Sequence, residues 1–382
     1  MHRQSCCVIP PHILRSIAEN GDAEQRDRAH ATLEQSAQFR GERALIGEMA
    51  SLLALPAGEK RRTVYDAKSA THLPGKLVRG EGSAASGDVA VDEAYDGAGK
   101  TYDFYRSVYG RSSVDGRGMR LDSTVHYSSH FDNAQWNGRQ MVYGDGDGRL
   151  FQRFTKCLDI IGHELTHGVT QFTASLFYGV ESGALNEHFS DVFGILVKQH
   201  ALKQSAQKSD WLIGAGIFTN KVHGAAVRSM KAPGTAYDDP VVGKDPQPSH
   251  MRGYSKMRSD NGGVHVNSGI PNHAFYLAAT MIGGNAWETA GRIWYVTLTT
   301  KLHTRATFRE CAAATLSAAT ELFGRASAPH DAVAKAWKEV GVEPQPLAEG
   351  PRVPIRRDFV PPSAGAEVPL PSLRRRGPRK AK

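Results

Sequence analysis

Two histidines four residues apart, in a stretch with an apolar face, constrain this chain more than any other feature. His163 and His167 stand in the run His-Glu-Leu-Thr-His. On an α-helix, residues four apart share one face, so both imidazoles can bind the same zinc ion. Glu164 would project beside them, where its carboxylate could act as a base on a metal-bound water. Nearby apolar residues supply a face that buries the helix: Ile160, Ile161, Leu165 and Val169.

A third candidate ligand follows at the start of a second helical pattern. Glu187 would complete a site of two histidines and one glutamate, leaving the fourth position of the metal to water, as in catalytic zinc sites. Asp191, one helical turn further, is suited to accept a hydrogen bond from a ligand imidazole. His188 is expected to point away from the ligands and to be incidental. The alternative is an amphipathic helix with two solvated histidines, because a short motif alone is only a hypothesis.

Several separated segments, in the right order, resemble the thermolysin-like zinc metallopeptidases. Beside the stretch with the two histidines, these segments are Asn133–Gly138, Met141–Gly148, Gly183–Asp191, Arg228–Met230 and Asp260–Gly269. The resemblance covers about residues 62 to 342. It implies an α+β fold of two lobes, in which a β-rich N-terminal lobe is joined to a mostly helical C-terminal lobe by the zinc-binding helix. The strand patterns of the first lobe predict mainly antiparallel pairing.

The resemblance also implies catalytic roles beyond the metal ligands. His265 and Tyr178 match the family's two donors to the oxyanion that forms on the peptide carbonyl. Asp260 matches the carboxylate that orients His265, and Glu164 is the general base. A non-catalytic binding protein on the same scaffold is an alternative, since a fold does not by itself imply a function. The intact Glu164, Tyr178 and His265 argue against it, because a scaffold needs no general base.

A substrate strand is expected to lie along the edge of the β-rich lobe. The resemblance implies that Asn133 holds it by its side chain and Ala134 by its backbone, while Arg228 binds the carbonyl on the leaving-group side. Three further positions match those that line an apolar pocket: Phe151, Ile160 and Val227. We therefore expect an endopeptidase that cleaves on the amino side of large hydrophobic residues. Selectivity should be broad, because an apolar pocket discriminates weakly.

Zinc is the expected cofactor, whereas the double calcium site of some family members is predicted to be absent. Of its five matching carboxylate positions, Asp159 and Asp210 remain. The other three hold residues that lack a carboxylate: Lys198, Leu212 and Ala215. Ca²⁺ needs six to eight oxygen ligands, and an ammonium replaces a cation rather than recruiting one. Lys198 is expected to pair with Asp159, and weak calcium binding at Asp145 and Asp147 remains open.

The chain divides into four predicted parts: 1–60, 61–158, 159–342 and 343–382. The second and third are the two lobes. The first is a charged helical segment that resembles the propeptide of the protealysin-like subgroup. We expect it to inhibit the enzyme, to assist folding and to be removed, autocatalytically, somewhere between about residues 45 and 62. A permanent helical appendage is the alternative. Cys6 or Cys7 could also reach the zinc as a thiolate.

The last part carries nine basic and four acidic residues and accounts for most of the formal net charge of +8. It is rich in proline and poor in apolar residues, which predicts disorder. Such a tail could bind anionic partners, although nucleic-acid binding is not the favoured interpretation. No apolar run is long enough to predict a membrane span, and the first residues lack the apolar core of a secretory signal. A cytoplasmic pool and export by a non-classical route are both compatible with these residues.

Overall fold

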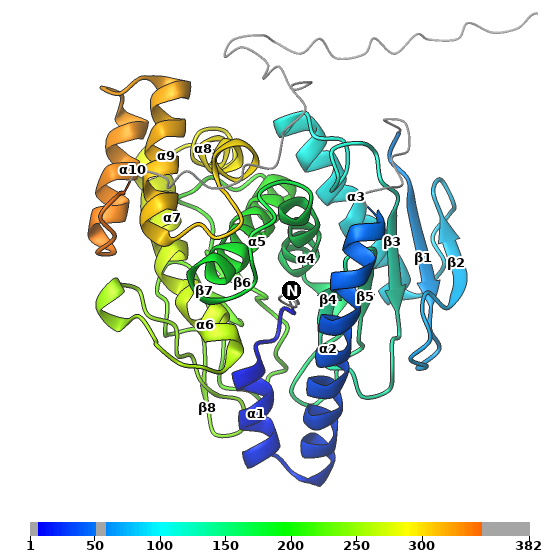
Figure 1. Ribbon diagram of the computed structural model, residues 1–382. Helices are drawn as coiled ribbons and strands as arrows, with labels where there is room; N and C mark the ends of the chain where they lie inside the picture. Colours follow the sequence, from blue (N-terminus) through cyan, green and yellow to red (C-terminus); the bar gives the residue numbers. More distant parts are fainter. Residues whose placement is uncertain (1–6, 51–58, 346–382) are drawn as a thin grey trace, which may run out of the picture.

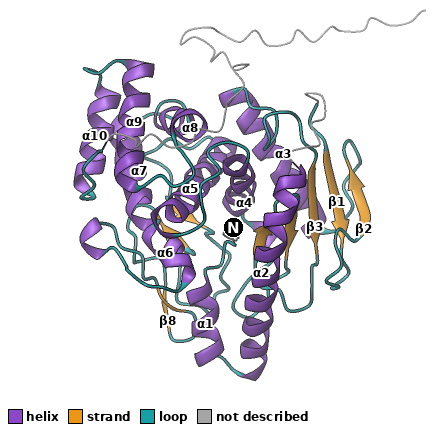
Figure 2. Ribbon diagram, in the orientation of Figure 1, coloured by secondary structure: helices purple, strands orange, loops and turns teal. Residues whose placement is uncertain are grey.

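Two lobes flank a central pair of helices (Figure 1). The structure, a computed structural model, describes residues 7–50 and 59–345, without the side chains of residues 40–50. The longer strands gather in one lobe and helices dominate the other (Figure 2), so the predicted α+β class is confirmed. Most of the predicted basic tail lies outside the described residues. Within them, no helix is long and apolar enough to cross a membrane.

The N-terminal lobe is built on a five-stranded sheet with the order β2-β1-β3-β5-β4. The strands are β1 (Arg62–Asp66), β2 (Lys76–Gly80), β3 (Leu121–Val125), β4 (Ala134–Trp136) and β5 (Met141–Tyr143). The two edge strands run antiparallel to their neighbours, whereas β1 with β3 and β3 with β5 are parallel. The prediction of mainly antiparallel pairing was therefore wrong. Helix α3 (Val89–Tyr109) precedes β3 and makes the long crossover that parallel strands need.

Helices α4 (Leu158–Gln171) and α5 (Val180–Leu202) pack side by side at the centre of the molecule. A short 3₁₀ turn, η1 (Phe154–Lys156), leads into α4. Glycines permit the close approach of the two helices. A Cβ on Gly194 would lie 2.5 Å from the Asp159 carbonyl oxygen, and one on Gly162 would lie 3.1 Å from Gly194 Cα. Residues on the facing sides of α4 and α5 are thereby brought together.

The C-terminal lobe is mostly helical, as predicted. Two small two-stranded sheets come first, β6 (Leu212–Ile213) with β7 (Arg228–Ser229) and β8 (Asp238–Asp239) with β9 (Gly243–Lys244). The helical elements that follow are η2 (Met251–Gly253), α6 (Asp260–Asn267), α7 (Gly269–Ile282), α8 (Ala290–Val296), η3 (Thr297–Lys301), α9 (Phe308–Phe323) and α10 (Ala328–Glu339). Thr307 and Glu310 form a capping box that fixes the start of α9.

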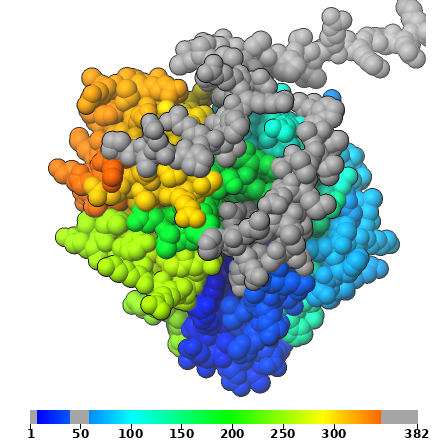
Figure 3. All heavy atoms as spheres, viewed as in Figure 1, coloured from blue at the N-terminus to red at the C-terminus, as the bar shows by residue number. Residues whose placement is uncertain are grey.

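The N-terminal segment forms two helices that lie between the lobes, at the lower front of Figure 3. Helix α1 (Pro11–Asn20) begins with a proline, a residue whose missing N–H costs nothing in the first turn. Helix α2 (Ala23–Ala50) follows. Six apolar side chains of this segment belong to the main hydrophobic core of the protein: Val8, Ile9, Ile13, Leu14, Ile17 and Ala29. The segment therefore shares its core with the rest of the chain.

Candidate active site

Three buried side chains from the two central helices converge on one point. The Nε2 atoms of His163 and His167 on α4 are 3.1 Å apart, and each lies 3.5 Å from a carboxylate oxygen of Glu187 on α5. Among the described residues, no other group of three or more His, Cys, Asp or Glu could hold a metal ion. Glu187 Oε2 is buried and makes no hydrogen bond. Two facing imidazole nitrogens and an unsatisfied carboxylate oxygen suit a zinc ion.

The other nitrogen of each ligand imidazole is held by a neighbour on α5. His163 Nδ1 donates to Asp191 Oδ1 at 2.8 Å. His167 Nδ1 lies 2.9 Å from both Asn186 Oδ1 and Ser190 Oγ. Such bonds fix the ring orientation and aim Nε2 at the metal. The structure thus places Asp191 where it was expected. Asn186 and Ser190 escaped sequence reasoning, although both lie within a turn of Glu187.

Asp191 also receives Arg228, whose guanidinium donates to both of its oxygens at 2.9 and 2.8 Å. Burial would raise the pKa of Asp191, but the charges of Arg228 and His163 hold it well below its usual value. A single ionised carboxylate therefore orients a metal ligand and the arginine predicted to bind substrate. The orientation of the metal ligand His163 and that of Arg228 thus both depend on Asp191.

His188 is not incidental, contrary to the sequence-based expectation. It points away from the metal ligands, but it is fully buried in a polar chain. Trp294 Nε1 donates to His188 Nε2 at 2.7 Å, and the opposite nitrogen, Nδ1, is 2.8 Å from Asn272 Oδ1. Asn272 Nδ2 in turn donates to Asp191 Oδ2 at 2.8 Å. Burial lowers the pKa of His188 to about 4, so a neutral imidazole completes this chain.

Glu164 and the oxyanion donors lie around the same point. The backbone N–H of Trp136, on edge strand β4, donates to Glu164 Oε2 at 2.8 Å. On the other lobe, His265 Nδ1 is 2.6 Å from Asp260 Oδ1, and its Nε2 is 3.2 Å from the Tyr178 hydroxyl. That hydroxyl donates to Glu187. Burial opposes the charged form of His265, but Asp260 and Glu187 raise its pKa above the ordinary value.

An unusual backbone turn brings Asp260 onto His265. Asp260 and Asn261 have φ values of +54° and +51°, and Gly262 and Gly263 continue in the left-handed region. Non-glycine residues rarely adopt this conformation, and it is concentrated at functional sites. The turn lets Asp260 bond both the imidazole and the backbone N–H of His265.

The residues predicted to hold a substrate strand instead hold the chain's own N-terminal segment. Ala134 accepts the N–H of Val8 at 3.3 Å. The Asn133 side chain accepts the N–H of Ile9 at 2.9 Å and donates to its carbonyl at 3.2 Å. Arg228 Nη1 donates to the Val8 carbonyl at 3.0 Å. Every main-chain group of residues 8 and 9 is thus bonded to the enzyme, as an extended peptide would be.

Comparison with known proteins assigns the whole of this architecture to one family. A sequence model of the thermolysin metallopeptidase catalytic domain matches residues 46–171, and one of the thermolysin alpha-helical domain matches residues 174–342. A third, of the protealysin propeptide, matches residues 6–35. The chain belongs to the thermolysin family of metallopeptidases. It is therefore a zinc endopeptidase with a propeptide, which we call the prosegment (residues 7–50 where described).

Individual relatives agree with this assignment. The chain is 51% identical to an "Extracellular metalloprotease" of Pectobacterium carotovorum over 342 residues, 89% of this chain and 97% of the relative. It is 46% identical to "Protease PrtS" of a Photorhabdus strain, over 88% of this chain and 92% of the relative. Among solved structures, the precursor of protealysin, a metalloproteinase from Serratia proteamaculans, matches with a TM-score of 0.81 and 51% identity, covering 88% of this chain and 99% of that one.

The three residues expected to line an apolar pocket are buried in this thermolysin-family chain. Phe151, Ile160 and Val227 are buried in the same hydrophobic cluster as Val8 of the prosegment. Ile160 and Val227 meet at Gly214, where an added Cβ would come within 3.4 Å and 3.0 Å of their side chains. The space beside these two residues therefore exists because residue 214 is a glycine.

The structure gives little support to a cysteine thiolate of the prosegment as a zinc ligand. Cys7 Sγ donates to the Ile9 carbonyl at 3.5 Å, and Cys7 is not in the metal-binding group. Cys6 lies outside the described residues.

Lys198, predicted to stand at one of the carboxylate positions of the family's double calcium site, pairs with the two carboxylates that remain. Its ammonium lies 3.1 Å from Asp159 Oδ2 and 3.0 Å from Asp210 Oδ1, and it donates to the Leu212 carbonyl at 2.9 Å. Ala215, at another of these positions, accepts a hydrogen bond from Cys157 Sγ through its backbone carbonyl. The expected pairing of Lys198 with Asp159 is present in the structure.

Asp145 and Asp147, considered for weak calcium binding, are engaged elsewhere. Asp145 pairs with His126 at 2.9 Å. Asp147 Oδ1 accepts the backbone N–H groups of residues 149–151.

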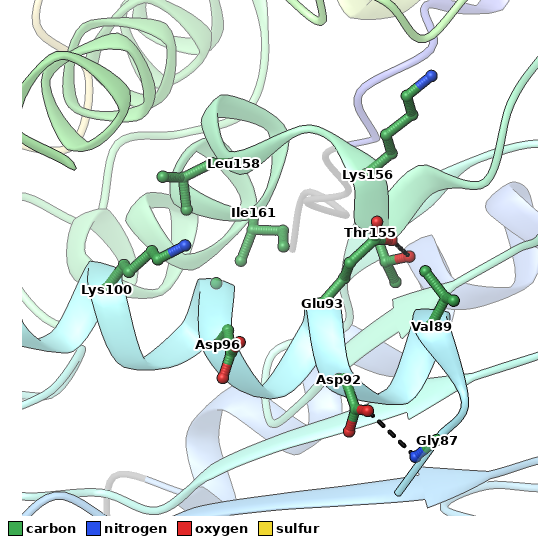
Figure 4. A pocket seen from close by; sticks show the side chains of 11 residues that line it. Gly87, Val89, Asp92, Glu93, Asp96, Lys100, Thr155, Lys156, Leu158 and Ile161 are labelled. Atoms are coloured by element: carbon green, nitrogen blue, oxygen red, sulfur yellow. Dashed lines mark hydrogen bonds between the residues drawn. The ribbon is translucent and has the colours of Figure 1, made fainter. Parts of the chain in front are cut away.

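A cavity of about 310 Å³ lies between α3 and the start of α4 (Figure 4). Its lining includes Asp92, Glu93 and Ile161 but none of the predicted site residues. Glu93 is already paired with Arg153 and Thr155, and Asp92 with Arg79. The cavity is therefore no candidate for the active site.

Proposed function

We propose that Glu164 is the general base of the endopeptidase and that His163, His167 and Glu187 hold its zinc. The observation that carries this assignment is the convergence of three buried ligand atoms beside a carboxylate held by the Trp136 N–H. Bound zinc supplies Lewis acidity and lowers the pKa of a bound water. Glu164 would accept a proton from the attacking water and pass it to the departing amine.

The opposite side of the site stabilises the charge that develops on the peptide carbonyl. Tyr178 and His265 donate to that oxygen, and Asp260 holds His265 in the required orientation. In the structure the Tyr178 hydroxyl bonds Glu187 and lies next to His265. This placement supports its role as a donor at the edge of the metal site.

Substrate positioning follows the contacts that the prosegment now makes. Asn133 and Ala134 would pair with the peptide backbone, and Arg228 with the carbonyl that follows the cleaved bond. Phe151, Ile160 and Val227 would receive the side chain on the leaving-group side. We therefore propose cleavage before apolar residues, with broad selectivity.

The prosegment acts as an intramolecular inhibitor that must be removed. Its residues 8 and 9 take the hydrogen bonds that a substrate needs. Its removal by the enzyme itself would require a cut before β1, because Arg62 is already paired with Glu81 at the start of that strand. The names of relatives such as the "Extracellular metalloprotease" of Pectobacterium carotovorum favour action outside the cell.

The test is peptide hydrolysis by zinc-loaded wild type and Glu164→Gln, followed with intact mass. Glu321→Gln, at an exposed site on α9, is the matched control. We expect Glu164→Gln to bind zinc, to keep its prosegment and to lose about 10²- to 10⁴-fold in kcat/KM. If the wild type stays inert with zinc bound and its prosegment removed by trypsin, the non-catalytic scaffold is the better interpretation.

A further inference from the structure

The peptide bond between Cys7 and Val8 lies where a substrate's cleaved bond would lie. On one side, the carbonyl oxygen of Cys7 is 3.1 Å from His265 Nε2, the proposed oxyanion donor. On the other side, the Val8 N–H bonds Ala134, and the Val8 carbonyl receives Arg228 at 3.0 Å. The contacts therefore define both the direction and the register of the prosegment in the site.

Side-chain burial agrees with this register. Val8, the residue directly after the bond, is fully buried and belongs to the main hydrophobic core, which also includes the residues of the expected apolar pocket. Ile9 is also fully buried. The described chain begins beside β4, where the Val8 N–H bonds the Ala134 carbonyl. An apolar residue with a β-branched side chain thus follows the bond, in agreement with the proposed specificity.

From this geometry we propose that the enzyme hydrolyses its own Cys7–Val8 bond, in addition to any cut that separates the prosegment from β1. The inference rests on the proposed endopeptidase function. Water adds across the bond, so that Cys7 gains a carboxylate and Val8 an amine, and Glu164 carries the proton between them. The reaction is intramolecular, because docking of the prosegment already holds the bond in place.

The cut does not release the remainder of the prosegment. Helix α1 stays attached to the C-terminal lobe, where His12 Nε2 is 2.8 Å from the Tyr237 hydroxyl and Ser16 donates to the Val241 carbonyl at 2.9 Å. Helix α2 stays attached to the N-terminal lobe, where Arg28 pairs with Asp132. A form that begins at Val8 therefore keeps residues 8 and 9 in the cleft and remains inhibited.

The experiment follows the purified, zinc-loaded full chain over time by intact mass and N-terminal sequencing. The expected product begins at Val8, and its rate of appearance does not change when the protein is diluted. Glu164→Gln should remain uncut at this bond, also when mixed with the wild type. A rate that rises with protein concentration, or cutting of Glu164→Gln by the wild type, would overturn the intramolecular step.

Variants of the prosegment test the register. Val8→Leu and Cys7→Ala should still be cut between residues 7 and 8. Val8→Asp should lose this cut, because the apolar pocket rejects a carboxylate. Circular dichroism establishes that each variant is folded, and hydrolysis of a reporter peptide after trypsin treatment establishes that each has an intact site.

Two negative results are distinguishable. If the enzyme hydrolyses the reporter peptide while the Cys7–Val8 bond stays intact, the inference fails and the proposed function stands. If neither is hydrolysed, the proposed function itself fails.

Discussion

Replacing Lys198 with methionine tests whether its ammonium substitutes for a structural cation. The lysine side chain is 12% exposed, and its partner Asp159, in the first turn of α4, is only 2% exposed. Burial alone would lower the pKa of Lys198, but the charges of Asp159 and Asp210 raise it above the ordinary value. The Lys198 ammonium is therefore charged over the whole neutral range. Methionine keeps most of the length of the side chain but removes its charge and its hydrogen bond to the Leu212 carbonyl.

The loss in the free energy of unfolding caused by Lys198→Met follows from the unpaired Asp159 carboxylate that it leaves behind. Removing one partner of a buried ion pair costs about 3–5 kcal/mol, because the other charge stays buried and unpaired. Asp159 retains bonds from the N–H groups of Gly214 and Ile160, which offset part of this cost. Asp210 is 43% exposed, so its loss of the lysine contributes about 1 kcal/mol at most. We expect a loss of about 2–4 kcal/mol in the free energy of unfolding.

Urea unfolding in the Glu164→Gln background, which prevents self-digestion, measures this loss. Lys335→Met, at an exposed position on α10, is the control and should change stability by less than about 0.5 kcal/mol. Added calcium should leave the parent protein unchanged. If Lys198→Met unfolds at the same urea concentration as the control, or if calcium stabilises the parent, the ammonium does not replace the ion.

Three further predictions concern the polar chain, the metal and pH. Asn272→Ala removes one of the two donors to Asp191 Oδ2 and should weaken zinc binding and kcat/KM by about 10- to 100-fold; unchanged zinc affinity in a competition assay would show that this chain of hydrogen bonds is only structural. Removing zinc with a chelator should abolish peptide hydrolysis while circular dichroism retains the helical signal, because most of the core lies away from the metal; unfolding on chelation would contradict this. Hydrogen bonding to Asp145 raises the pKa of His126 to about 9, so this pairing stabilises the protein fully below about pH 6.5 and is lost as the pH rises through about 9. His126→Gln should remove that part of the pH dependence, at most about 1 kcal/mol because the group is partly exposed; urea midpoints of equal pH dependence in both proteins would refute it.

The local parts of the site could be predicted because their residues lie close together in the sequence. His163, Glu164 and His167 need only one helix, and Asp191 needs only one turn beyond Glu187. The existence of the lobes, the helical C-terminal half and the pairing of Lys198 with Asp159 also followed from the resemblance.

Contacts between distant segments could not be predicted in the same way. Nothing near His188 shows that it would meet Asn272 and Trp294, because this chain of bonds crosses three helices. The parallel pairing of β1 with β3 depends on the path of α3 rather than on the alternation within either strand. The register of residues 7–9 depends on hydrogen bonds to both lobes, and the hydrophobic periodicity of the sequence does not predict such bonds.

The shared core of the prosegment has a consequence for the mature enzyme. Val8, Ile9 and the apolar face of α1 fill the same hydrophobic cluster that holds the pocket residues. Burial of this surface is part of what drives the precursor to fold. Once the prosegment leaves, the apolar side chains that it covers are exposed to water, and exposed apolar surface attracts other apolar chains. In the mature enzyme, each bound substrate would therefore bury, for as long as it stays bound, apolar surface that the prosegment buries in the precursor.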